Sequence, residues 1–66
     1  MLQITDLSLT KHLINLSNLN NVVIRQQSDA HVISFHMRDH HVLPITVDQV
    51  TAERIQSELL NLGANL

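Results

Sequence analysis

Apolar side chains recur at every second position through the middle of the chain, and this alternation limits the fold more than any other feature of the sequence. β-branched residues are frequent in these runs, and alternation of this kind is typical of strands that bury one face. The alternation predicts three consecutive strands. They cover residues 22–25, 31–38 and 42–47.

Two short turn segments join these runs and set the expected register. Ser28-Asp29 is suited to a two-residue turn, and residues 38–40 to a three-residue loop. Pro44 cannot donate a backbone hydrogen bond, so the third run is expected at an edge or with Pro44 at an unpaired position. The predicted cross-strand pairs place apolar on apolar: Ile24 with Ile33, Val22 with Phe35, Phe35 with Leu43, and Ile33 with Ile45.

A helix is expected before the strands, over about residues 8–19. Its apolar side chains recur at i, i+4 and i+7, which places them on one helical face: Leu9, Leu13 and Leu16. Asp6 or Ser8 is the expected N-cap, because a side-chain oxygen there accepts from free N–H groups of the first turn. Residues 1–5 alternate weakly and are expected to form a short strand or an ordered arm.

A second helix is expected after the strands. Asp48 or Thr51 would cap it, and Gly63 is a natural stop. Its apolar stripe consists of Ala52, Ile55, Leu59 and Leu62. The predicted fold is therefore α+β in two layers: a three-stranded antiparallel β-meander with one helix before and one after (α-β-β-β-α), both helices packed on one sheet face. Residues 1–66 form a single small domain.

Size and composition favour association with another chain. A 66-residue chain buries a modest share of its surface, and small folds usually rely on disulfides, a metal or a partner. The absence of Cys excludes disulfides and thiolate metal sites. Only 15% of residues are charged, against about 25% in an average domain. We therefore expect a homodimer or another protein partner.

Several functional classes are disfavoured by the same composition. The net charge is −2 and the four basic residues are scattered, so nucleic acid is not an expected partner. Phe35 is the one aromatic residue, which leaves no platform for stacked bases. The apolar stretches are short for a membrane span, and the N-terminus does not have the pattern of a secretory signal. We expect a cytoplasmic protein without membrane contact.

The segment HMRDHH at 36–41 is the one candidate for a metal site. His36, Asp39 and His40 would have to converge, as His and carboxylate ligands do around zinc. We interpret the segment instead as a turn that Asp39 initiates, although metal binding by His36, His40 and His41 stays open. No catalytic residue, metal or cofactor is predicted, since the sequence has no nucleophile motif and no glycine-rich loop.

The expected element order resembles that of the double-stranded RNA-binding domain and of the HicA-type mRNA interferase toxins. In the toxins the catalytic His lies on the middle strand, and a Pro-containing third strand leads into the last helix. The matching positions here are His31, Pro44 and Gly63. The resemblance implies an RNA-directed toxin or an RNA-binding domain with His31 as the active residue, which is the alternative function.

The preferred hypothesis is a small non-enzymatic protein-binding module: a regulator, adaptor or inhibitor that acts through an oligomeric apolar surface. Four aliphatic residues fall off the predicted core stripes or on the polar sheet face. Several such residues on one small chain favour a partner-binding surface. The predicted interface residues are Ile14, Leu60, Val32 and Val42.

Overall fold

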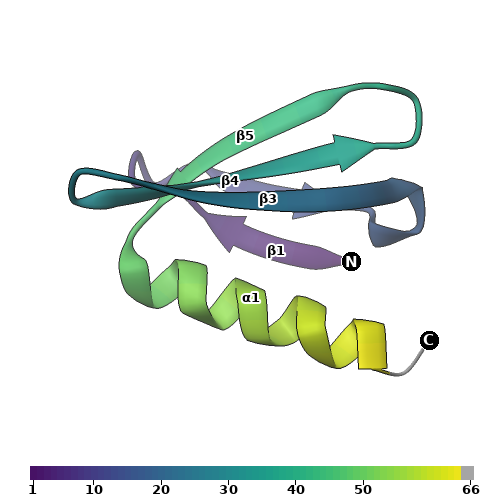
Figure 1. Ribbon diagram of the computed structural model, residues 1–66. Coiled ribbons are helices and arrows are strands. Elements are labelled where there is room, and N and C mark those ends of the chain that lie inside the picture. Colours follow the sequence, from purple (N-terminus) through teal and green to yellow (C-terminus); the bar gives the residue numbers. More distant parts are fainter. Residues whose placement is uncertain (65–66) are drawn as a thin grey trace.

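The computed structural model describes residues 1–64. These residues form a three-stranded sheet, a two-stranded hairpin and one helix, and the hairpin and the helix lie beneath the sheet in Figure 1. The strands are β1 (Leu2–Thr5), β2 (Lys11–Ile14), β3 (Leu19–Gln27), β4 (Ala30–Met37) and β5 (Val42–Val47). A 3₁₀ turn, η1 (Leu16–Asn18), precedes β3, and helix α1 (Gln49–Ala64) ends the described chain. The protein is a mixed α+β chain.

The predicted meander is confirmed in both order and register. β3, β4 and β5 form an antiparallel sheet in that order. The four apolar pairs expected from the sequence are all present. The turn at Ser28-Asp29 has two residues, and the loop between Met37 and His41 has three. Apolar spacing and turn length together were therefore enough to place these strands.

The predicted N-terminal helix is wrong, and so is the α-β-β-β-α order. β1 and β2 form an antiparallel hairpin over this segment, with Leu2 opposite Ile14. Two of the leucines assigned to the helical stripe face solvent instead, Leu9 at 83% and Leu13 at 67% exposure. The hairpin prevails because period-two alternation buries Leu2, Ile4 and Ile14, which the helix would not have brought to one face.

The predicted C-terminal helix is confirmed. Asp48 precedes it and accepts a hydrogen bond from the Thr51 N–H at 2.7 Å, as an N-cap does. Ala52 and Ile55 are buried and Leu59 packs against the core, whereas Leu62 is exposed. The helix continues to Ala64, one residue beyond the predicted stop, which is within the usual uncertainty of a helix end.

Helix α1 and the β1–β2 hairpin lie on the same side of the sheet (Figure 1), where the sheet's apolar residues point. The Arg54 guanidinium donates to the Gln3 carbonyl at 3.4 Å, which joins α1 to β1. The Leu7 N–H donates to the Thr46 carbonyl at 3.0 Å, which joins the hairpin loop to β5. The shared core consists of Leu2, Ile4, Ile14, Ile33, Phe35, Ile45, Val47, Ala52 and Ile55.

Candidate functional site: the open edge of strand β3

The segment HMRDHH forms the β4–β5 loop. Asp39 accepts a hydrogen bond from the His41 N–H at 3.2 Å, and its other oxygen lies 2.9 Å from His41 Nδ1. These bonds from His41 lower the pKa of Asp39. Within residues 1–64 no three His, Asp or Glu side chains are grouped closely enough to hold a metal ion. The loop geometry thus matches the turn that Asp39 was predicted to initiate.

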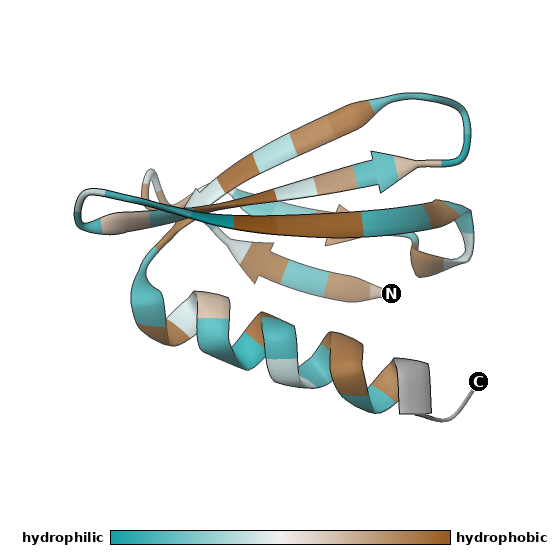
Figure 2. Cartoon of the chain, in the orientation of Figure 1, coloured by the Kyte–Doolittle hydropathy of each residue, from teal (hydrophilic) through white to brown (hydrophobic). Residues whose placement is uncertain are grey.

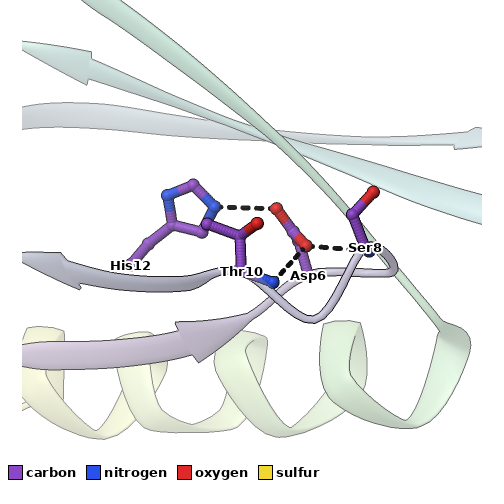
Figure 3. A network of polar contacts seen from close by, with 4 residues as sticks. All are labelled: Asp6, Ser8, Thr10 and His12. Carbon is purple, nitrogen blue, oxygen red and sulfur yellow. Dashed lines mark hydrogen bonds and ion pairs between the residues drawn. The ribbon is translucent and has the colours of Figure 1, made fainter.

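A second polar network closes the β1–β2 loop (Figure 3). Asp6 Oδ1 accepts from the N–H groups of Ser8 and Thr10 at 2.8 and 2.9 Å, and Asp6 Oδ2 lies 2.9 Å from His12 Nε2. The bond to His12, followed by that to Thr10, lowers the pKa of Asp6. The Ser8 hydroxyl points away from the His12 ring in Figure 3, so the His–Asp pair does not activate this hydroxyl. These hydrogen bonds fix the conformation of the β1–β2 loop.

His31, the residue suggested by the toxin resemblance, lies on the inward register of β4 between Gln26 and Val47. Its Nδ1 atom is buried and has no hydrogen-bond partner among the described residues. The element order on which the resemblance was based is not the order of this chain, because β1 and β2 replace the first helix. The fold therefore gives no support to the RNA-directed alternative.

The four predicted interface residues do not share one surface. Ile14 is 3% exposed and belongs to the core, so its placement at the surface is corrected. Val32 and Val42 both lie on the uncovered face of the sheet, where Val32 is half-buried and Val42 exposed. Leu60 is exposed on α1, which packs on the opposite side of the sheet. Only Val32 and Val42 share a face of the sheet, and they lie at opposite ends of the β4–β5 pair, because Val32 is opposite Thr46 and Val42 opposite His36.

The two edges of the three-stranded sheet differ sharply. The Met37 N–H donates to the His41 carbonyl, so alternation along β5 directs the backbone groups of Val42, Pro44 and Thr46 away from β4. Pro44 has no N–H to offer there, and the Thr46 carbonyl is occupied by Leu7. Proline and covering loops are recognised ways of blocking a strand edge. The β5 edge is therefore closed to a further strand.

The outer edge of β3 is open. Gln27 and Ala30 flank the two-residue turn and exchange hydrogen bonds, so alternation directs the N–H and C=O groups of Val22, Ile24 and Gln26 outward. Within residues 1–64 these groups make no backbone hydrogen bond to another element. β3 also has nine residues, whereas β1 and β2 have four each. It is thus the longest edge with outward donors and acceptors in the described chain.

The side chains at the centre of β3 are apolar and partly exposed. Val23 is 39% exposed on the uncovered sheet face, and Ile24 is 36% exposed on the other face. Figure 2 shows this centre as a brown segment with teal segments on both sides. Sequence reasoning overlooked this edge. The available signals were three consecutive apolar residues, Val22 to Ile24, and a proline in β5 but not in β3.

An apolar groove of about 510 Å³ adjoins this edge. It lies where the start of β3 meets the end of α1, and Val22 forms part of its wall. Its other apolar side chains are Leu16, Leu19, Leu59 and Leu62. Apolar surface therefore continues from the β3 edge onto the helix side of the sheet.

Comparison with known proteins adds no family to this description. No family model, no curated protein and no solved structure matches the chain. Among the described residues, no helix combines the length and the apolar character that crossing a membrane requires.

Proposed function

We propose that this chain is a non-enzymatic protein-binding module that binds an extended segment of a partner protein along the outer edge of β3. The observation that supports the proposal is the contrast between the two sheet edges. Pro44 and Leu7 obstruct the β5 edge, whereas β3 directs three residues' backbone groups to solvent. In strand addition, backbone hydrogen bonds provide affinity and alternate side chains provide specificity.

The side chains of β3 support this mode of binding. Long edge strands with apolar side chains pair readily with other chains unless charges, prolines or bulges prevent it. Arg25 is the single charged residue of β3, and the bulge lies at its start, between Leu19 and Asn21. Residues 22–24 thus combine free backbone groups with apolar side chains that a partner strand would bury.

The test removes one outward N–H group and leaves the internal ladder intact. In Ile24→Pro, proline replaces a residue whose N–H is not used in the β3–β4 pairing, so the fold should persist while strand addition is blocked. Val42→Pro is the matched control, because it makes the same change at an outward position of the obstructed β5 edge. Circular dichroism would establish that both variants are folded.

Binding would be measured with tagged wild-type, Ile24→Pro and Val42→Pro chains in cells that express the protein. We expect partners retained by wild type and Val42→Pro to be lost from Ile24→Pro. Amide hydrogen exchange on the reconstituted complex should then show slower exchange at Val22, Ile24 and Gln26. Partners that remain on folded Ile24→Pro, or protection confined to other elements, would overturn the proposal.

A further inference from the structure

We infer that the strand added at β3 comes from a second copy of this chain, whose β3 pairs antiparallel with the first about a two-fold axis at Val23. This inference rests on the proposed function and names its partner. An interface around a two-fold axis requires a surface that is complementary to itself. The sequence of β3 and the direction of its backbone groups together meet this requirement.

The backbone geometry permits this register. Val22 and Ile24 direct their hydrogen-bonding groups outward, whereas those of Val23 are used by β4. Across an axis at Val23, Val22 therefore exchanges hydrogen bonds with the partner's Ile24, and Ile24 with the partner's Val22. The two Val23 residues face each other as a pair without hydrogen bonds, at a Cα–Cα distance of about 4.5 Å.

The polarity of β3 is symmetric about the same residue. Apolar Val22, Val23 and Ile24 form the centre, and polar residues follow on both sides, Asn20 and Asn21 before and Arg25 and Gln26 after. An axis at Ile24 would instead place Val22 opposite Gln26 of the partner. An axis at Val23 pairs apolar with apolar residues and polar with polar residues, which is the favoured arrangement across strands.

The charges and the groove agree with this register. Arg25 lies opposite the partner's Asn21 and not opposite a second Arg25, so no like charges are directly opposed. The partner's Ile24 lies beside Val22 on the helix side of the sheet, at the wall of the 510 Å³ groove. Ile24 is 36% exposed in a single chain, and in the dimer its side chain would lie against the groove of the partner copy.

Single cysteines test the register directly, because the chain has no cysteine of its own. In Val23→Cys the two sulfur-bearing residues face each other across the axis, within the Cα–Cα range of 4.4–6.8 Å that disulfides require. In Val22→Cys or Ile24→Cys, each cysteine lies diagonally from its copy at about 7–8 Å, which is outside that range. Mild oxidation should therefore give a covalent dimer of Val23→Cys only, measured by non-reducing electrophoresis.

Sedimentation equilibrium at micromolar concentration supplies a second test. Wild type should sediment as a dimer, and Val23→Glu as a folded monomer, because two carboxylates would be opposed on the axis. Val42→Glu, at an exposed position of β5 (51% against 39% for Val23), should remain dimeric. If the wild type is monomeric and Val23→Cys does not cross-link, the second copy is not the partner. If Ile24→Cys cross-links in preference to Val23→Cys, the proposed register is wrong. If Ile24→Pro still lost a different partner, the proposed strand addition would stand and only self-association would fail.

Discussion

Among residues 1–64, three residues other than glycine have positive φ, and each lies in one of the three hairpin loops. They are Leu9 (φ 65°), Ser28 (φ 50°) and His40 (φ 71°). Left-handed backbone costs an L-amino acid with a side chain roughly 1–2 kcal/mol. The loops of Leu9 and His40 each contain an aspartate whose oxygens bond to loop N–H groups. Side-chain hydrogen bonds thus hold these loops in a conformation that glycine usually supplies.

The Ser28 turn should be improved by glycine. Positive φ at the first of two loop positions is the pattern of a type II′ turn, in which glycine is preferred. We expect Ser28→Gly to raise the free energy of unfolding by about 1 kcal/mol, measured by urea denaturation at one fixed protein concentration. Asp29→Gly is the control and should not stabilise, because Asp29 does not have positive φ. Equal effects of both variants would contradict this account.

Acid should weaken the fold through Asp6. Its hydrogen bonds, first from His12, lower its pKa in the folded chain, so below the ordinary value of about 3.9 the unfolded chain binds the proton more readily. The stabilisation from Asp6 is complete above that value and is lost as pH falls through the folded pKa. We expect the midpoint temperature of thermal unfolding to decrease as the pH is lowered below about 4. Asp6→Asn and His12→Gln should both reduce this dependence of the midpoint temperature on pH. If either variant has the same pH dependence as the wild type, the prediction is contradicted.

At the scale of whole elements, the sequence predicted the meander and α1 but not the N-terminal hairpin. The meander was predictable because alternation, turn length and apolar pairing all pointed to one register. The apolar residues among the first fourteen fit both the helical period and the alternation of a strand. Leu9 and Leu13 fit a helical stripe, whereas Leu2, Ile4 and Ile14 fit a hairpin.

The choice between these periods depends on what the rest of the fold buries. The apolar face of the sheet is covered by α1 and the hairpin together, and the core contains Leu2, Ile4 and Ile14. The loop is also unusual for a hairpin, since Leu9 occupies a position where glycine is typical. The local pattern of this segment favoured a helix, but tertiary contacts and the hydrogen bonds of Asp6 stabilise the hairpin instead.

Helix α1 depends on its buried face. Ile55 is fully buried against the sheet, whereas Leu60 of the same helix is exposed. We expect Ile55→Ala to lower the free energy of unfolding by about 2–5 kcal/mol, which is a large part of the stability of a small domain. Leu60→Ala should change it by less than about 0.5 kcal/mol. Circular dichroism during urea unfolding measures both, and comparable losses would contradict the packing of α1 described above.

At the scale of the whole molecule, the candidate site could not be predicted from local pattern. Which strand edge is open depends on strand order and on the Leu7–Thr46 hydrogen bond, which joins segments far apart in the sequence. The sequence did indicate an exposed apolar surface and a partner chain, which remain proposals. Its four interface residues were chosen from a fold that had a helix where β2 lies, and this is why Ile14 was misplaced.

Self-association should make thermal stability depend on concentration. If the folded chain is a dimer, mass action raises the midpoint of unfolding as protein is added, by roughly 3–5 °C for each tenfold increase. The Val23→Glu variant should show no such dependence. Scanning calorimetry over a hundredfold range of concentration measures both, and a constant midpoint for wild type would contradict a dimer in that range.

The core joins Leu2 and Ile4, from the start of the chain, to Ile55, close to the other end. Synthesis proceeds from the N-terminal end at about 5–20 residues per second, so the β1–β2 hairpin is made before the strands and the helix that it packs against. An isolated two-stranded hairpin is at best marginally stable in water. The core therefore cannot close until Ile55 of α1 has been released, and the apolar centre of β3 is made before the helix.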